Sequence, residues 1–318
     1  MIDYKIFSVN NFELSQRIAD SLSKNLGKLK IDQFSDGEMS PQFGESIREK
    51  RVFLICTTSS PTEIVKLLLA LDAAKRASAR EVIAILPYYG YSRQDRKEGP
   101  RGAIGARLMA DLIQTAGADR LICLDLHADQ IQGFFNGPLN LISGHIVFSS
   151  FLRNLPADQY TICSPDAGGV KRANKFYQQF LKQFPDATFA MLSKLRDKPN
   201  SIERMDLIGD VTGRHVIIID DMIDTGGTLI KAAQLLKEGG ATQVSACITH
   251  GVLSGEGHPR IMMSDYLDKL IISDSIEQEV VNNKIETVSC ASAIAATIEA
   301  ITSSTSLEEA LDRLLELN

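Results

Sequence analysis

The chain has 318 residues, of which 44% are hydrophobic and 23% are charged, and its formal net charge at pH 7 is −6. This composition excludes an intrinsically disordered chain, and the negative charge argues against a protein dedicated to binding nucleic acid. The length suffices for two domains of ordinary size. The sequence shows no charged-then-apolar leader and no apolar run of the roughly 20 residues needed to cross a bilayer. We therefore expect a cytoplasmic protein without membrane contact.

Short runs rich in valine, isoleucine and leucine alternate along the chain with longer segments of helical periodicity. This alternation predicts an α/β protein with mostly parallel sheets flanked by helices. The expected strands lie near residues 52–56, 82–87, 121–125, 160–163, 188–192, 216–220, 243–249 and 270–273, and the expected helices near residues 11–24, 62–78, 102–117, 169–183 and 227–239.

Glycine and proline near residue 137, followed by a polar patch near residue 145, mark the weakest point of this pattern. A last helical segment begins with Ser306 as a candidate N-cap, and no strand follows it, so we expect it to pack back on a domain or a partner. The expected division is an N-terminal domain over residues 1–145, a C-terminal domain over residues 146–300, and this helix over residues 301–318.

Residues 34–38, Phe-Ser-Asp-Gly-Glu, place two acids around a glycine, close to an aromatic ring. A turn of this kind can stack a base on Phe34 and accept hydrogen bonds from a purine amino group or a ribose with Asp36 or Glu38. The alternative is an ordinary hairpin, because Asp-Gly is a common turn dipeptide.

Residues 87–97 follow an expected buried strand and combine three tyrosines with three cations. Open α/β sheets bind ligands at the carboxyl ends of their strands, so Arg93 and Gln94 are candidates to clamp a polyphosphate or a nucleotide. The alternative is a surface loop anchored by its aromatic residues, with its arginines facing water.

Two further strands end in candidate ligands. His127 lies between Asp125 and Asp129, which favours a metal-binding role over that of a satisfied structural histidine. Asp166 precedes a diglycine and a helix, which predicts an acid and free N–H groups on the ligand side. On that helix, Arg172 and its neighbouring lysine fit either a small polyanion or a solvated face.

Residues 193–200 open a polar stretch between two expected strands. Lys194 and Arg196 alternate along it, as in a mobile loop whose cations close over a transferred phosphoryl-type group. The alternative is an ordinary hairpin with a charged edge strand.

Residues 216–228 form an apolar strand that ends in Asp220 and Asp221 and continues into a turn that opens a helix. The helix start can direct N–H groups and the positive end of its dipole at a phosphate, while the two acids bind ribose hydroxyls or a metal hydrate. The turn consists of Asp224, Thr225, Gly226, Gly227 and Thr228, in which the glycines allow close approach and the threonines add donors. The pattern predicts a sugar-phosphate site; an ordinary strand-to-helix connection is the alternative.

Residues 216–228 resemble the 5-phosphoribosyl-1-diphosphate (PRPP) motif that phosphoribosyltransferases share with the synthetases of that compound. Phosphoribosyltransferases lack the Phe-Ser-Asp-Gly-Glu and Tyr-Ser-Arg-Gln-Asp-Arg segments. From Phe34 to about Ile276 the chain therefore resembles the ribose-phosphate diphosphokinase (PRPP synthetase) family. That family transfers the β,γ-diphosphoryl group of ATP to the C1 hydroxyl of ribose 5-phosphate and releases AMP.

The resemblance implies two phosphoribosyltransferase-like domains, each a mostly parallel sheet flanked by helices, and a homo-oligomer whose active site lies near a subunit interface. Its implied ligands are ATP, ribose 5-phosphate and Mg²⁺, without nucleic acid. Position by position, it implies that ATP is held by Phe34, Asp36, Gly37, Glu38, Arg93 and Gln94, Mg²⁺ by His127 and Asp166, and ribose 5-phosphate by Arg196, Asp220, Asp221, Asp224, Thr225, Gly226, Gly227 and Thr228, while Lys194 and Arg196 stabilise the transferred group.

The chain departs from the commonest family pattern after Arg96, where it lacks the stretch that many regulated members use for activation by phosphate and inhibition by ADP. The resemblance therefore leaves allosteric control open. Two other functions stay open as well: a phosphoribosyltransferase, and a non-catalytic regulatory paralogue of the same family. The retained candidate ligands argue against the paralogue.

Overall fold

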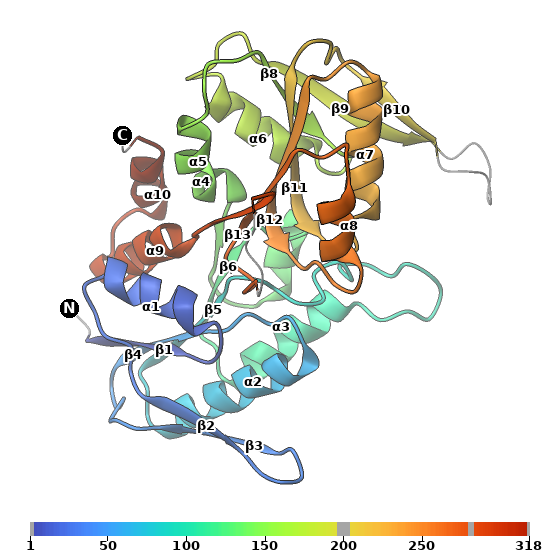
Figure 1. Ribbon diagram of the computed structural model, residues 1–318. Coiled ribbons are helices and arrows are strands. Elements are labelled where there is room, and N and C mark those ends of the chain that lie inside the picture. The colour runs from blue at the N-terminus through green and yellow to red at the C-terminus, as the bar shows by residue number, and fades with distance from the viewer. Residues whose placement is uncertain (1–2, 196–203, 279–282, 317–318) are drawn as a thin grey trace. The chain divides into compact units, whose positions relative to one another are not determined.

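The computed structural model describes residues 3–195, 204–278 and 283–316, without the side chains of residues 194, 195 and 204 (Figure 1). It divides into two compact units. Unit 1 comprises Met1–Ile146, Ser275–Glu277 and Ser289–Asn318, and unit 2 comprises Val147–Asp274 and Gln278–Val288. Residues 289–300, predicted as part of a C-terminal domain, thus belong to unit 1. Within the described residues, no helix combines the length and the apolarity needed to cross a membrane.

Unit 1 is built on a parallel sheet in the order β1-β4-β5-β6-β7, beside a separate antiparallel pair, β2 and β3. The strands are β1 (Tyr4–Ser8), β2 (Leu29–Gln33), β3 (Met39–Phe43), β4 (Arg51–Ile55), β5 (Glu81–Leu86), β6 (Arg120–Leu124) and β7 (Leu139–Ile142), and the helices are α1 (Phe12–Ser21), α2 (Pro61–Arg76), α3 (Gly105–Ala116), the 3₁₀ helix η1 (Asp129–Phe134), α9 (Ala291–Ser303) and α10 (Leu307–Glu316), with α4 (Gly144–Val147) at the unit boundary.

Helix α2 shows how the sequence produces a helix that covers the unit 1 sheet. Ser60 caps it by accepting a hydrogen bond from the Glu63 N–H at 3.3 Å, and Pro61 occupies its first turn. Leu67 and Leu71, one turn apart, are buried against the sheet, and α3 packs beside α2 (Figure 1). Helix α2 therefore covers a face of the unit 1 sheet, and the ends of the strands lie at the edge of that sheet.

Unit 2 contains a sheet in the order β10-β9-β8-β11-β12-β13-β14, parallel except for the β9–β10 pair. The strands are β8 (Tyr160–Ser164), β9 (Thr188–Leu195), β10 (Arg204–Ile208), β11 (His215–Ile223), β12 (Gln243–Gly251), β13 (Lys269–Ser273) and β14 (Ile285–Val288), and the helices are α5 (Ser149–Arg153), α6 (Val170–Phe180), α7 (Gly227–Glu238) and α8 (Gly257–Met263).

Strand β11 is the centre of unit 2 because both of its faces are buried. Val216 and Ile218 join the apolar cluster on the α7 side, whereas Ile217 and Ile219 join the cluster on the α6 side. A strand buried on both faces is typical of a parallel sheet between helices, and it produces the continuous apolar run seen in the sequence. The carboxyl ends of β8, β11 and β12 consequently meet at one edge.

The predicted fold class is confirmed, and each strand and helix predicted by residue range has an observed counterpart. The sequence pattern gives no range for the strands β1, β2, β3, β7, β10 and β14 or for the helices η1, α4, α5, α8 and α9. Helix α9 is alanine-rich and buried around most of its circumference, so it lacks the one-sided periodicity that reveals an amphipathic helix. It packs against α1, β7 and α10, which explains why the C-terminal segment belongs to unit 1.

Candidate functional site

The carboxyl end of β11 carries two adjacent acids, Asp220 and Asp221, as the sequence indicates. Asp221 has 5% of its side chain exposed and Asp220 has 30%. Arg172, in the first turn of α6, places Nη1 3.1 Å from Oδ1 of Asp221 and 3.7 Å from Oδ1 of Asp220. Because the Arg172 side chain is only 15% exposed and pairs with acids, its solvated-face interpretation is wrong. The available signal was its place in the first turn of a helix that directly follows an expected strand, and the structure then shows that this strand, β8, pairs with β11.

The carboxyl of Asp220 is easily protonated. Its pKa is raised well above the ordinary value, first because burial penalises the charged form and second because the Asp221 carboxylate lies next to it. Arg172 acts in the opposite direction. Two acids that share one cation can accept hydrogen bonds from a diol or hold a hydrated cation, and either ligand favours the ionised form.

The turn between these acids and α7 depends on Gly226. Its backbone is left-handed, with φ 76° and ψ −8°, a conformation that glycine adopts without steric cost. A Cβ at this position would lie 3.3 Å from Cδ1 of Ile261. Helix α7 begins at Gly227, and its N-cap residue, Gly226, has no side chain that could cap it. The N–H groups of its first turn and its dipole are therefore suited to an anion.

The polar side chains of this turn differ in their surroundings. Thr225 and Thr228 are exposed, so their hydroxyls are accessible to a ligand. Asp224 is half-buried, and its Oδ1 accepts a hydrogen bond from the hydroxyl of Ser254. Arg260 donates from Nη1 to the carbonyl of Thr225 at 2.6 Å.

Sequence reasoning did not find Ser254 and Arg260. Both follow β12, which pairs with β11 in parallel, so their segment begins at the same edge of the sheet. A Ser-Gly turn after the apolar strand 243–251 was the available signal. This signal does not predict a site by itself, because the sequence does not show that β12 lies next to β11 in the sheet.

The connection from β8 to α6 holds Asp166, the candidate metal ligand of unit 2. Its Oδ1 accepts a hydrogen bond from the Gly169 N–H at 2.9 Å, and the Ser164 hydroxyl donates to its carbonyl at 2.7 Å. The expectation of free N–H groups is therefore wrong for Gly169, because its N–H donates to the carboxylate of Asp166.

In unit 1, residues 34–38 form the tip of the β2–β3 hairpin, so the hairpin interpretation describes the backbone correctly. The Phe34 N–H donates to the Glu38 carbonyl at 2.8 Å, and Oδ1 of Asp36 accepts from the Glu38 N–H at 3.0 Å. Gly37 supplies a φ of 94°. The ring of Phe34 is 58% exposed, which leaves it accessible for stacking.

Arg93 and Gln94 lie in the loop after β5, and both side chains are exposed. The loop is anchored by Tyr89, whose buried hydroxyl donates to the Ala106 carbonyl at 2.9 Å. The Gln94 carbonyl in turn accepts from the Ala106 N–H at 3.2 Å. The predicted aromatic anchor is thus present, and it places both polar side chains at the carboxyl edge of the sheet.

His127 lies three residues after the end of β6 and is exposed. Asp125, two residues before it, is buried and has a φ of 42°. A left-handed non-glycine residue at a strand end is uncommon and marks a sharp change of chain direction there. The turn brings His127 to the carboxyl edge of the unit 1 sheet.

The two candidate catalytic cations are not placed by the structure. Lys194 lies in β9, where its backbone is paired with Met205 of the antiparallel strand β10, but its side chain is not described. Arg196 lies outside the described residues. The hairpin alternative is correct for the strands; the role of the cations remains a prediction.

The described residues contain no cluster of three or more histidine, cysteine or acidic side chains that could hold a metal. Mg²⁺ does not require one, because it keeps several waters and is usually bound by one or two carboxylates together with substrate phosphates. Half-buried Asp166 fits this manner of binding, since it is an oxygen donor at a ligand edge.

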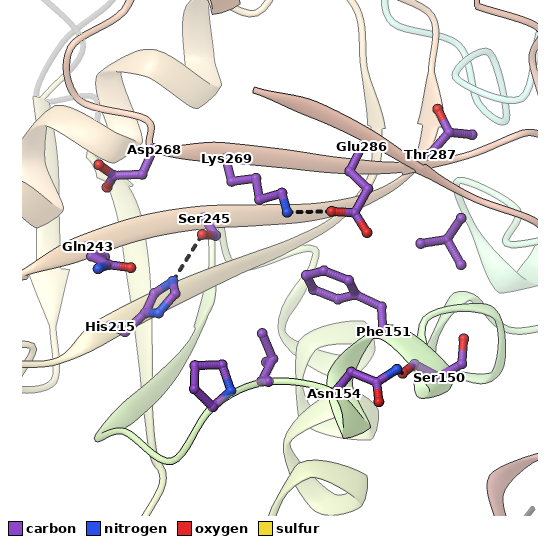
Figure 2. A pocket seen from close by; sticks show the side chains of 13 residues that line it. Ser150, Phe151, Asn154, His215, Gln243, Ser245, Asp268, Lys269, Glu286 and Thr287 are labelled. Atoms are coloured by element: carbon purple, nitrogen blue, oxygen red, sulfur yellow. Dashed lines mark hydrogen bonds and ion pairs between the residues drawn. The ribbon is translucent and has the colours of Figure 1, made fainter. Parts of the chain in front are cut away.

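A groove of about 720 Å³ in unit 2 lies near the amino-terminal ends of β11, β12 and β13 (Figure 2). Its polar groups pair with one another: His215 Nε2 lies 2.9 Å from Oγ of Ser245, and Lys269 forms an ion pair with Glu286. No predicted site residue lines it. The groove is therefore separate from the candidate site.

Comparison with known proteins connects these features to a family. A model of the N-terminal domain of ribose phosphate pyrophosphokinase matches residues 4–117, and a model of the phosphoribosyl synthetase-associated domain matches residues 185–311. A ribose-phosphate pyrophosphokinase of Campylobacter jejuni is 44% identical over 293 residues, covering 91% of this chain and 93% of the relative. Another, of Rhizobium meliloti, is 42% identical over 316 residues, covering 98% of this chain and 100% of the relative.

A solved structure agrees with the sequence relatives. The crystal structure of phosphoribosylpyrophosphate synthetase from Mycobacterium smegmatis matches with a TM-score of 0.85 and 33% identity, covering 95% of this chain and 99% of the other. Both the sequence likeness and the structural likeness thus extend over nearly the full length. The chain belongs to the ribose-phosphate pyrophosphokinase family.

Proposed function

We propose that this chain is a ribose-phosphate diphosphokinase, which moves the β,γ-diphosphoryl group of ATP to the C1 hydroxyl of ribose 5-phosphate and yields PRPP and AMP. The observation that carries the proposal is the β11–α7 connection. There, the two carboxylates near the end of β11 are followed by a short turn with a left-handed glycine, Gly226, at which α7 starts. This order suits a ligand with vicinal hydroxyls and a phosphate.

The 5-phosphate of the sugar is proposed to bind the N–H groups at the start of α7, with the exposed hydroxyls of Thr225 and Thr228 as further donors. Asp220 and Asp221 accept hydrogen bonds from the ribose hydroxyls. Because Arg172 compensates part of their charge, both carboxylates can lie mostly out of water before the substrate binds. The site then holds the C1 hydroxyl in place for attack on the β-phosphorus.

ATP is proposed to bind the residues of unit 1. The exposed ring of Phe34 stacks on adenine, Asp36 and Glu38 accept hydrogen bonds from the nucleoside, and Arg93 and Gln94 contact the polyphosphate. We further propose a homo-oligomer with the active site near a subunit interface. The exposure of Phe34 at a hairpin tip supports this, since a ring so placed can reach ATP on a neighbouring subunit.

Mg²⁺ is proposed to be held by His127 and Asp166. When bound, it would neutralise phosphate charge at the β- and γ-positions. Lys194 and Arg196 are proposed to stabilise the diphosphoryl group as its charge develops, with Arg196 also contacting ribose 5-phosphate. In-line attack needs no covalent enzyme intermediate, so positioning and charge are sufficient.

The test is phosphorus NMR of the purified protein with ATP, Mg²⁺ and ribose 5-phosphate. The proposal predicts that AMP and PRPP appear together in equal amounts. ADP would instead indicate transfer of a single phosphoryl group. No turnover, despite bound ribose 5-phosphate, would contradict the proposal and favour a regulatory paralogue, and ATP-independent consumption of PRPP with a base would favour a phosphoribosyltransferase.

A further inference from the structure

The segment after β12 holds the turn that opens α7 in place at several points. The Val252 N–H donates to the Ile223 carbonyl at 2.9 Å, just before the turn. Ser254 donates to the Asp224 carboxylate, and Gly257 packs so closely that a Cβ there would lie 2.5 Å from the Asp224 carbonyl oxygen. The shape of the turn therefore depends on a neighbouring strand and the chain that follows it.

Arg260, on α8, makes the contact closest to the start of α7. Its Nη1 donates to the Thr225 carbonyl at 2.6 Å and lies 3.5 Å from where a Cβ of Gly227 would be. Among the described residues, this carbonyl is the one acceptor recorded for Arg260. The side chain is exposed, so burial does not force it into this position.

The position of Arg260 adds a positive charge to the amino end of α7. A cation is favoured at the carboxyl end of a helix and disfavoured at the amino end, where the dipole is positive. Here Arg260 lies beside Gly227 at the amino end of α7. An anion bound at the start of α7 would be attracted both by the helix dipole and by the charge of Arg260.

We propose that Arg260 is a positioning residue for the 5-phosphate of ribose 5-phosphate. Acting through the Thr225 carbonyl, it fixes the peptide that precedes Gly226, so that the N–H groups of the turn are oriented toward the phosphate before binding. Its charge adds to the positive potential at that point. This inference rests on the proposed function, and it goes beyond it because Arg260 comes from outside the sugar-phosphate motif.

Replacement of Arg260 tests the proposal in steady-state assays of AMP formation. For Arg260→Ala we expect the KM for ribose 5-phosphate to rise roughly tenfold to a hundredfold, the range expected for losing a hydrogen bond to a charged group. The KM for ATP should change by no more than about twofold, as for a site left untouched. A merely structural role would instead lower the unfolding midpoint and raise both KM values together.

Two further variants sharpen the result. Lys231→Ala removes an equal charge from an exposed site on α7, and it should change either KM by less than about twofold. Arg260→Lys keeps the charge but loses the planar fork, so its KM for ribose 5-phosphate should lie between those of the wild type and Arg260→Ala. An equal effect of Lys231→Ala would overturn the proposal, because the effect would then reflect net charge and not the Thr225 contact.

Failure of this inference is distinguishable from failure of the proposed function. If the wild type forms AMP and PRPP but Arg260→Ala keeps its KM for ribose 5-phosphate, only the role of Arg260 is refuted. If the wild type is inactive, calorimetry with ribose 5-phosphate and no ATP still tests Arg260. Unchanged affinity in the variant would then overturn the inference independently.

Discussion

Two connections in unit 2 share a sequence pattern and differ in structure. Asp-Ala-Gly-Gly at residues 166–169 and Asp-Thr-Gly-Gly at residues 224–227 both lead from a parallel strand into a helix, and their strands, β8 and β11, are neighbours in one sheet. In the first, the carboxylate of Asp166 accepts a hydrogen bond from the N–H of Gly169, the N-cap residue of α6. In the second, the carboxylate of Asp224 accepts a hydrogen bond from the hydroxyl of Ser254, which comes from the segment after β12.

The backbone also differs at the third residue of the two patterns. Gly226 is left-handed with φ 76°, whereas Gly168 does not have a positive φ. The left-handed residue directs the chain differently into α7, and the contacts made by Ser254 and Arg260 hold it there. Equal motifs thus give two turns that differ in backbone conformation and in the partner of their aspartate. The deciding contacts come from the segment after β12.

The largest expected difference between the two turns comes from replacing the third residue of each Asp-x-Gly-Gly pattern by alanine. Gly226→Ala puts a side chain at a left-handed position and close to Ile261, which costs about 1–3 kcal/mol of stability. Misplacement of the turn should lower kcat/KM for ribose 5-phosphate by about a hundredfold. The matched control is Gly168→Ala, where φ is not positive, and the measurement is kcat/KM from initial rates. Equal losses in both variants would refute the distinction between the two turns.

Arg172 connects the two regions, since it lies on α6 and pairs with the acids that end β11. It lowers the pKa of Asp220, so Arg172→Gln should raise that pKa further. A carboxyl with a higher pKa loses its proton only at higher pH. The carboxylate that accepts hydrogen bonds from ribose is then scarcer on the acid side of the profile.

For this variant we expect kcat/KM for ribose 5-phosphate to fall by about tenfold at the acid end and by less at the alkaline end. The pH profile of kcat/KM, measured beside that of the wild type, tests this. The control is Arg153→Gln, which removes an arginine elsewhere in unit 2. Arg153 is half-buried and is the last residue of α5. A uniform loss at every pH would show that Arg172 does not act through the protonation of Asp220.

The smallest expected effect concerns Asp166, whose two roles can be separated. Asp166→Ala removes the acceptor of the Gly169 N–H and should lower the free energy of unfolding by about 1 kcal/mol in urea without Mg²⁺. Asp166→Asn keeps an oxygen acceptor for the Gly169 N–H, so its stability should stay close to that of the wild type. Both variants should need more Mg²⁺ for half-maximal turnover if Asp166 holds the metal. A normal Mg²⁺ requirement in Asp166→Asn would exclude that role.

Several features followed from the sequence because they depend on neighbours along the chain. The apolar run 216–219 predicts a doubly buried strand, and the pattern that follows it predicts a strand-turn-helix connection with two acids at its start. The order of the segments indicates the family, which the comparisons confirm. Local periodicity and short motifs suffice for such features because the backbone conformation of each element is set largely by its own residues.

Other features depended on contacts between residues far apart in the sequence. Arg172 reaches Asp221 only because α6 follows a strand adjacent to β11, and Arg260 reaches Thr225 across 35 positions. Helix α9 belongs to unit 1 because it packs on α1, nearly the length of the chain away. The order of strands in a sheet decides which side chains share an edge, and periodicity does not encode that order. The sequence alone therefore determined which groups can bind a sugar phosphate, and tertiary packing decided which of two similar turns is shaped to do so.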